Sequence, residues 1–430
     1  MIRIAKGDRA YCERFIQSLK DRISENDRSV EDKVAAILRD VRDNGDAAVR
    51  AYSVKFDGWV PDALEITMEE IEAITADCDP EFLAAMERAA ANIRDFHARQ
   101  KQQSRIDPSP TGVIMGQRVR GLHRVGVYVP GGTAAYPSSV LMNCVPAKIA
   151  GCKEIVMVTP PSKNGKVNPH ILAAAAVAGV DRVFKVGGAQ AIAALAYGTE
   201  SVPKVDKIVG PGNAFVAEAK KQVFGRVSID MIAGPSEILV IADGTCNAKY
   251  VAADLLSQAE HDRMASAVLV TDSEKLAADV AEELERQLPL LEREEIARTS
   301  IDNNGKIIIT GSIDEAVEVA NSIAPEHLEI CVDEPFMYLD KIKNAGSIFM
   351  GKYCPEALGD YMAGPNHTLP TSGTARFSSP LSVDDFVKKT QFSYFTKDAL
   401  SKVARDVEYF ASKEGLGAHA KSAVIRFDEE

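Results

Sequence analysis

The chain has 430 residues, of which 46% are hydrophobic and 26% are charged, and its formal net charge is −12. This length predicts two or three domains with a packed core, and the acidic balance without a long basic run argues against a nucleic-acid-binding protein. The N-terminus has no apolar stretch of signal-peptide length, and the most apolar run, residues 171–180, is too short to span a membrane, so we expect a cytoplasmic protein with no membrane partner.

The first quarter of the chain predicts helices. Ser29 suits an N-cap, and apolar residues recur at helical spacing from residue 34 to residue 41. A second helix is predicted over residues 80–100, which place several apolar side chains on one face. Prolines and glycines between residues 104 and 119 indicate a connector that is followed by an edge strand.

From residue 125 onward, short β-branched runs alternate with alanine-rich segments, which predicts parallel sheets with helices on both faces. The expected strands are 125–129, 154–159, 182–186 and 207–209, then 237–242, 267–270, 306–310, 328–332 and 347–350. The expected helices are 138–150, 169–178, 189–196 and 214–224, then 248–260, 273–298 and 313–322. We therefore expect an α/β fold of two tandem doubly wound, incomplete Rossmann-like domains. One helix over 397–412 and an extended tail should follow, and that tail must pack on its own chain or on a partner subunit.

Three glycine-containing turns follow predicted strands, where ligands collect in open α/β sheets. They span residues 128–132, 187–190 and 210–213, and each precedes a helix whose first N–H groups could bind a phosphate. None has the G-x-G-x-x-G spacing, and no following strand ends in an acidic residue that would bind a ribose. From the turns alone, a dinucleotide site and tight turns without a ligand stay equally open.

Several polar residues stand in settings that suit chemistry. Gln258 and His261 are three residues apart and share a helix face, which suits two metal ligands, although Glu260 is the more usual zinc donor and a surface cluster stays open. Glu326 and His327 are adjacent before a strand, which suits paired acid–base work or, equally, a helix end beside a capping histidine.

Later in the chain, Asp360 and His367 lie in a polar, turn-rich stretch, and Glu414 and His419 lie in the tail beside glycines. A set of nitrogen and carboxylate donors that suits zinc is formed by His261, Asp360 and His419, although spacing cannot show that these three residues converge. The residues themselves therefore indicate an α/β enzyme for which a metal and a nucleotide both stay open.

At these same residues the chain resembles the histidinol dehydrogenase family, over residues 37–426. The resemblance is carried by 127–132 (VYVPGG), 209–213 (VGPGN), 232–237 (IAGPSE), 258–261 (QAEH) and 364–370 (GPNHTLP), with a weaker match at 414–419. It implies two successive hydride transfers that oxidise L-histidinol to L-histidine through L-histidinaldehyde, in the last step of histidine biosynthesis.

The resemblance also implies a set of ligand-binding residues. One zinc ion per subunit would be held by Gln258, His261, Asp360 and His419. NAD would contact Tyr128, Gln190 and Asn213. The substrate L-histidinol would contact Ser236, Gln258, His261, His327, Asp360, His367, Glu414 and His419. Family members are homodimers whose tails cross, so Glu414 and His419 would complete the partner's site.

Within this scheme His327 takes the alcohol proton, Glu326 activates a water for the aldehyde step, and zinc positions the substrate. A route through a thiohemiacetal of Cys144 or Cys152 is disfavoured, because neither cysteine has a thiolate-stabilising setting. The seven cysteines form no C-x-x-C pair, which favours buried thiols in a reducing compartment: Cys12, Cys78, Cys144, Cys152, Cys246, Cys331 and Cys354.

We expect four parts in the chain. They are an N-terminal helical segment (1–22), a discontinuous α/β domain with the metal and catalytic residues (23–127 and 237–380), an inserted Rossmann-like NAD domain (128–236) and a swapped tail (381–430). Three alternatives remain. They are a dehydrogenase of the same fold that acts on another small polyol or a sulfonated diol, a zinc hydrolase that uses Glu326, and a non-catalytic binding module. The tail residues Glu414 and His419 favour histidinol.

Overall fold

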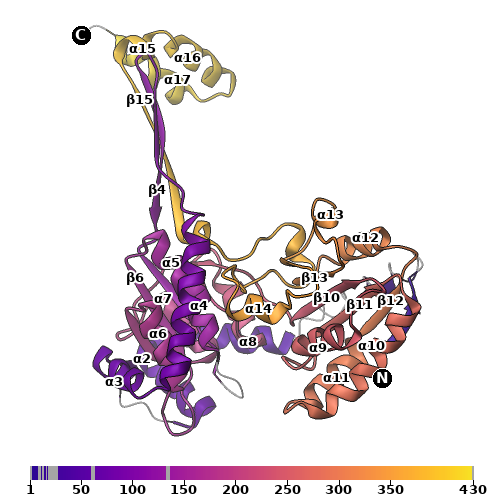
Figure 1. Cartoon of the computed structure of the whole chain (residues 1–430). Coiled ribbons are helices and arrows are strands. Elements are labelled where there is room, and N and C mark those ends of the chain that lie inside the picture. The colour runs from indigo at the N-terminus through magenta and orange to yellow at the C-terminus, as the bar shows by residue number, and fades with distance from the viewer. Residues whose placement is uncertain are drawn as a thin grey trace.

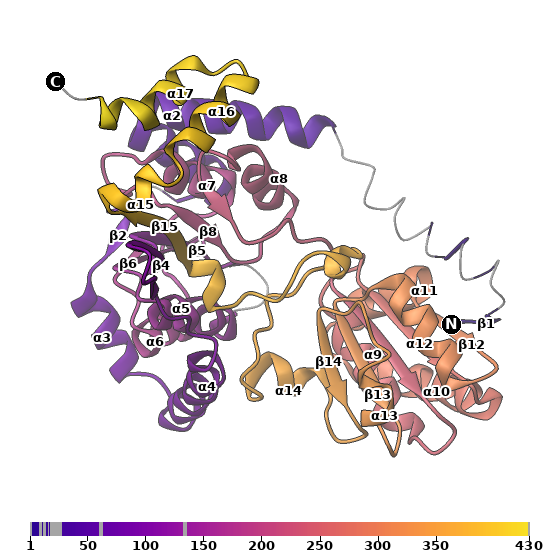
Figure 2. The ribbon, with the colours of Figure 1, turned by 90° about the horizontal axis from the view of Figure 1, so that it is seen from above.

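The computed structural model describes residues 2–7, 11, 14–15, 17, 28–59, 63–131 and 136–428. They form two six-stranded sheets, each covered by helices on both faces, and a three-stranded sheet that extends away from both (Figure 1). Seen from above, the two sheet domains stand side by side (Figure 2). Within the described residues, every helix is too short or too polar to cross a membrane.

The first domain is built on the sheet with strand order β2-β7-β6-β5-β8-β9, in which only the β2–β7 pair is antiparallel. Side chains alternate along β6, so that Ile155 and Met157 enter one core while Val156 and Val158 enter the other. Helices α3–α6 cover the first face, and α2, α7 and α8 cover the second. The strands are β2 (Glu65–Ile66), β5 (Arg124–Tyr128), β6 (Glu154–Thr159), β7 (Arg182–Lys185), β8 (Lys207–Val209) and β9 (Ser228–Ile229). The helices are α2 (Arg28–Asp57), α3 (Met68–Ala76), α4 (Pro80–Ala98), α5 (Pro137–Ala150), α6 (Pro169–Ala178), α7 (Gly188–Tyr197) and α8 (Ala214–Val223).

The second domain is an all-parallel sheet with strand order β1-β12-β11-β10-β13-β14. Helices α9–α11 pack on one face and α12 packs on the other, which buries the apolar runs of the central strands. The strands are β1 (Arg3–Lys6), β10 (Glu237–Ala242), β11 (Ser266–Thr271), β12 (Lys306–Ile309), β13 (His327–Cys331) and β14 (Ser347–Met350). The helices are α9 (Ala248–Ala259), α10 (Glu274–Gln287), α11 (Glu294–Asn304), α12 (Ile313–Ile323), α13 (Phe336–Leu339) and α14 (Glu356–Tyr361).

A narrow arm projects from the first domain (Figure 1). It consists of β3 (Arg105–Pro108), β4 (Val113–Gly121) and β15 (Val387–Phe395), and β15 pairs with β4 in an antiparallel ladder along its whole length. At its tip lie α15 (Lys397–Ser401), α16 (Ala404–Lys413) and α17 (Gly417–Val424). Tyr409 and Phe410 on α16 are 68% and 69% exposed, so the tip presents apolar surface to its surroundings.

The expected α/β class with parallel sheets is confirmed, but the expected domain grouping is wrong. We expected residues 23–127 to join residues 237–380, whereas the structure packs α2, α3 and α4 on the first sheet and makes β5 a central strand of it. The apolar stripes of these helices enter the two cores of that sheet, which fixes their place. The N-terminal segment 1–22 was expected to be helical, but its residues 3–6 form β1, an edge strand of the second sheet, and much of the rest lies outside the described residues.

Two helix predictions also need correction. The expected helix 273–298 is interrupted at Leu288–Leu290, because Pro289 cannot continue the hydrogen-bond ladder of α10. The expected helix 397–412 is divided between α15 and α16, and the segment expected as an extended tail forms α17. The strand β15 was not predicted.

Candidate functional site

A cavity of about 640 Å³ lies between the two sheet domains. The first domain contributes the turns that follow β5 and β8, at the carboxyl ends of its parallel strands, where ligands usually bind. The second domain contributes residues at the amino ends of its parallel strands. Ser236 precedes β10 and Glu326 precedes β13, so the cavity lies at the amino ends of these strands.

Glu326 and His327, at the start of β13, are both buried and both line this cavity. The Nδ1 atom of His327 lies 2.9 Å from the carbonyl oxygen of Glu237, and its Nε2 atom has no hydrogen-bond partner among the described residues. The backbone N–H of Glu237 donates to Oε2 of Glu326 at 2.9 Å. Burial raises the pKa of Glu326 to about 8, although His327 and this N–H oppose the rise. The two side chains therefore present an imidazole nitrogen and a carboxyl of raised pKa to one cavity.

Three of the four predicted metal donors, Gln258, His261 and Asp360, line the same cavity. Gln258 lies in the last turn of α9 and is buried, yet neither amide atom has a hydrogen-bond partner among the described residues. Leaving a buried amide without partners costs free energy, which a ligand atom would offset. An amide oxygen, an imidazole and a carboxylate are donors that suit a divalent cation such as zinc.

Asp360 and His367 form a pair on one wall of the cavity. Oδ1 of Asp360 lies 3.4 Å from Nδ1 of His367, whose Nε2 lies 3.3 Å from Oγ of Ser139. Burial alone would raise the pKa of Asp360, but hydrogen bonding to His367 and the nearby charges of His367, His327 and His261 lower it to about 2. Asp360 is therefore a carboxylate at neutral pH, as a metal ligand must be.

Glu356 is a residue of this site that the sequence analysis missed. It begins α14 and is buried, with Oε1 3.7 Å from Nε2 of His327 and with Oε2 accepting from Oγ of Ser257 at 3.0 Å. Ligand atoms of His327, Glu356 and Asp360 all lie within 4.8 Å of one another. The signal for Glu356 was its spacing of four residues from Asp360, which places both on one helix face.

A second cavity, of about 800 Å³, lies at the carboxyl ends of the first sheet. Tyr128 ends β5, and its hydroxyl accepts from the N–H of Gly188 at 3.2 Å. Gln190 lies in the first turn of α7, and its buried Oε1 has no hydrogen-bond partner among the described residues. Asn213 is the N-cap of α8. Gly131 and Asn213 line both cavities, so the two cavities adjoin.

The structure adds an acidic residue to this second cavity. Asp57, the last residue of α2, lines it, and Oδ2 of Asp57 is buried without a hydrogen-bond partner among the described residues. Burial raises the pKa of Asp57 to about 6. The carboxylate that binds a ribose usually ends a strand, and no local pattern marks Asp57 at the end of this distant helix.

The turn after β8 is fixed by a buried ion pair between Lys220 and Asp230. Lys220 also donates to the carbonyl of Gly210 at 3.0 Å, while Asp230 accepts from the N–H of Gly210 at 2.8 Å. Gly210 has φ of 108°, and a Cβ at this position would collide with the carbonyl oxygen of Tyr128. Glycine is therefore required where this turn approaches β5.

Two predicted site residues lie elsewhere. Glu414 follows α16 and His419 lies on α17, both exposed at the end of the arm, and neither lines the cavity of the same chain. Cys144 and Cys152 are buried and line neither cavity, and burial raises the pKa of both thiols, that of Cys152 to about 11. Cys12 lies outside the described residues.

Comparison with known proteins gives one consistent result. A family model described as Histidinol dehydrogenase matches residues 20–427. The chain is 56% identical over 427 residues to a histidinol dehydrogenase of Clostridium acetobutylicum, covering 99% of each chain. It is 57% identical over 415 residues to one of Bacillus cereus, covering 96% of each. The crystal structure of histidinol dehydrogenase from Elizabethkingia anophelis superposes with a TM-score of 0.93 at 38% identity, covering 99% of this chain and 98% of that one.

Proposed function

Because the chain belongs to the histidinol dehydrogenase family, we propose that it oxidises L-histidinol to L-histidine in two NAD-dependent hydride transfers at a zinc site. The chain is an oxidoreductase of histidine biosynthesis. The main observation in support of NAD-dependent oxidation of L-histidinol is the pair of adjoining cavities, which share Gly131 and Asn213. A substrate in one cavity and a nicotinamide in the other would lie within reach of hydride transfer.

Zinc would be held by Gln258, His261 and Asp360 of one subunit and by His419 of the other. The orphaned amide of Gln258 and the low pKa of Asp360 support this assignment. When bound, zinc holds and polarises the substrate, and NAD accepts the hydride of each oxidation. His367, beside Asp360, would orient the polar end of the substrate, together with Ser236.

His327 would act first. Its Nδ1–H donates to the carbonyl of Glu237, so Nε2 carries the lone pair and can take the hydroxyl proton as the hydride leaves the alcohol carbon. The product is L-histidinaldehyde. Glu356, 3.7 Å from Nε2, would stabilise the positive charge that His327 then carries.

Glu326 would act in the second oxidation. It would remove a proton from a water that adds to the aldehyde carbon, which gives a hydrate. The hydrate then loses the hydride of its C–H bond, the second hydride of the overall reaction, and one hydroxyl proton, which leaves the acid. A carboxyl with a pKa of about 8 suits a general base near neutral pH. The buried thiols of Cys144 and Cys152 take no part in this scheme.

NAD would occupy the second cavity. Tyr128, Gln190 and Asn213 line its wall, and the first N–H groups of α7 and α8 suit phosphate oxygens. Asp57 would accept hydrogen bonds from the hydroxyls of a ribose and would repel the extra phosphate of NADP.

The arm supports a homodimer in which each tail completes the partner's site. A ladder that is mostly exposed and carries exposed aromatic residues at its tip has apolar surface to bury. A second copy of the chain would cover this surface and would bring Glu414 and His419 to the cavity.

The test is the absorbance of NADH after purified protein is mixed with NAD and L-histidinol, with and without prior chelation. Two NADH per histidinol, lost on chelation and restored by zinc, are expected. Reduction of NAD by another alcohol but not by histidinol would overturn the substrate. Turnover that needs no NAD would overturn the reaction class in favour of a hydrolase.

A further inference from the structure

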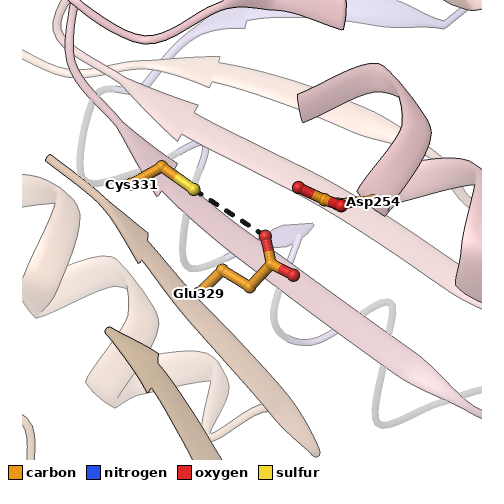
Figure 3. A group of neighbouring side chains, drawn as sticks. All are labelled: Asp254, Glu329 and Cys331. Atoms are coloured by element: carbon orange, nitrogen blue, oxygen red, sulfur yellow. Dashed lines mark hydrogen bonds between the residues drawn. The ribbon is translucent and has the colours of Figure 1, made fainter. Parts of the chain in front are cut away.

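Three elements that carry site residues meet around the side chain of Glu329. Strand β13 carries His327, helix α9 carries Gln258, and helix α14 carries Glu356 and Asp360. Their relative positions set the distances between the reactive side chains. The side chain of Glu329 on β13 contacts the other two elements, and Figure 3 shows its immediate surroundings.

The first contact of Glu329 fixes α14. Its Oε1 accepts a hydrogen bond of 2.6 Å from the backbone N–H of Glu356, the first residue of that helix. This N–H has no partner within the helix, as is general for a first turn. Because Glu356 and Asp360 are four residues apart, anchoring the first turn also fixes the direction in which both carboxylates point.

The second contact fixes α9. The carboxyl of Asp254 faces that of Glu329, and their oxygens lie within 4.8 Å of one another and of Sγ of Cys331 (Figure 3). Burial, together with the charge of Asp254, raises the pKa of Glu329 well above its ordinary value, and burial also raises the pKa of Asp254. Asp254 precedes Gln258 by four residues and so shares its helix face.

The third contact of Glu329 is with Cys331 on the same strand. Sγ of Cys331 lies 3.8 Å from Oε2 of Glu329 and donates to it. Glu329 is almost fully buried, and none of the three residues lines the cavity. The group therefore touches the structure that supports the site, and not the substrate.

We propose that the buried Glu329–Asp254 pair is a positioning unit that holds α9 and α14 against β13 and thereby sets the spacing of Gln258, His327 and Asp360. The inference rests on the proposed zinc site, since metal ligands are the groups most sensitive to such spacing. Residues that orient metal ligands typically change metal affinity about 10-fold to 100-fold when they are altered.

The experiment measures zinc affinity by competition with a chromogenic chelator, alongside the melting temperature of each protein. Glu329→Gln keeps an acceptor for the N–H of Glu356 and a donor for Asp254, so its zinc affinity should stay within about 3-fold of wild type. Glu329→Leu fills a similar volume but removes both contacts, and its affinity should fall about 10-fold or more.

A matched control separates positioning from general loss of stability. Glu283 is a buried glutamate of the same domain, on α10, paired with Arg286. Glu283→Leu should lower the melting temperature and leave zinc affinity unchanged. Should Glu329→Leu fail to fold, Asp254→Ala replaces it, because alanine preserves the helix and removes only one side of the pair.

The outcomes are distinct. Wild-type protein without zinc affinity would overturn the proposed function, and this inference with it. Wild-type protein that binds zinc, with folded Glu329→Leu or Asp254→Ala binding it equally well, would overturn the inference alone. Equal losses in Glu329→Gln and Glu329→Leu would also overturn it, because hydrogen bonding would then not be the cause.

Discussion

The Nδ1 atom of His327 lies 2.9 Å from the backbone carbonyl oxygen of Glu237 on the neighbouring strand β10. A carbonyl oxygen can only accept, so this contact places the proton of the neutral imidazole on Nδ1. In the neutral ring Nε2 is left with a lone pair, buried and without a hydrogen-bond partner among the described residues. Burial opposes protonation of His327, but the charges of Glu326, Glu356 and Asp360 outweigh burial and raise the pKa of the ring, which favours uptake of a proton at Nε2. Sheet register thus selects the tautomer that a proton acceptor needs.

Replacing His327 tests this assignment. Asn at this position can still donate to the carbonyl of Glu237 but has no nitrogen where Nε2 stood. We expect His327→Asn to lower kcat for histidinol by about 10²-fold to 10⁴-fold, the usual contribution of a general base. Zinc content and KM should change little. Turnover within 3-fold of wild type would contradict the role of His327.

Glu326 should make the rate of the second oxidation depend on pH. Its pKa of about 8 means that the carboxylate form accumulates as pH rises. Oxidation of histidinaldehyde should therefore rise up to about pH 8 and level off above it, and Glu326→Gln should be slow at every pH. Steady-state rates with the aldehyde as substrate, measured from pH 6 to pH 9, check this. A flat wild-type profile would contradict a base of this pKa.

Many helices and strands could be predicted because the sequence signal of each lies within the element itself. The β-branched run of β6 and the alanine-rich sequence of α6 each predict their element from a few consecutive residues. The strand β15 shows no such signal, because its nine residues are mostly exposed and do not alternate between an apolar and a polar face. The helix α17 is hard to predict because it is only eight residues long and begins at a glycine, Gly417.

The site was predictable where chemistry is grouped along the chain. Gln258 with His261, and Glu326 with His327, stood out as candidates from spacing, although spacing alone left a surface cluster and a capping histidine open. Asp57 could not, since it reaches the cavity from the end of α2 only after the chain has folded over the sheet. Choosing Gln258 over Glu260 as a metal donor likewise came from the family resemblance, because both side chains are compatible with the spacing.

The ion pair behind the turn after β8 predicts a large effect on stability. Lys220→Met leaves the buried carboxylate of Asp230 without its counter-charge, and we expect the free energy of unfolding to fall by about 3–5 kcal/mol. Adding Asp230→Asn removes the unpaired charge and keeps an acceptor for the N–H of Gly210, so the double variant should recover most of the loss. Urea unfolding measures both. A double variant no more stable than the single one would contradict this account.

Asp57 is expected to select NAD over NADP. Asp57→Asn should bind NAD about 10-fold more weakly and should lose most of its discrimination against NADP, because the hydrogen bonds to a charged acceptor and its repulsion of phosphate disappear together. Trp59 is the one tryptophan of the chain, so its fluorescence can report binding of both nucleotides. Asp43→Asn, at an exposed site of the same helix, is the control. Unchanged discrimination in Asp57→Asn would contradict the role.

Asp57→Asn should also change the stability of the protein when no nucleotide is bound. The pKa of Asp57 in the folded protein, about 6, lies above the ordinary value of 3.8, so folding is favoured by protonation and loses stability as pH rises between these values. Asp57→Asn cannot ionise, so its melting temperature should exceed that of the wild type at pH 7, and the difference should shrink toward pH 4. A variant less stable than wild type at pH 7 would contradict this sign.

The arm predicts that two inactive variants can restore each other. His261→Ala removes a donor from the cavity, and His419→Ala removes one from the tail. If tails cross, a mixed dimer has one site with both changes and one site with neither. With random exchange, half of the dimers are mixed and half of their sites are intact, so activity should return to about a quarter of the wild-type rate.

The control is a pair of variants that are both altered in the cavity. His261→Ala mixed with Asp360→Ala should stay inactive, because every site then carries one change whichever subunit supplies the tail. Subunits are exchanged by mild denaturation and refolding with zinc, and NADH formation is measured against each variant refolded alone. If His419 served its own chain, the mixture of His261→Ala and His419→Ala would be as inactive as this control, since no combination of subunits could then assemble an unaltered site.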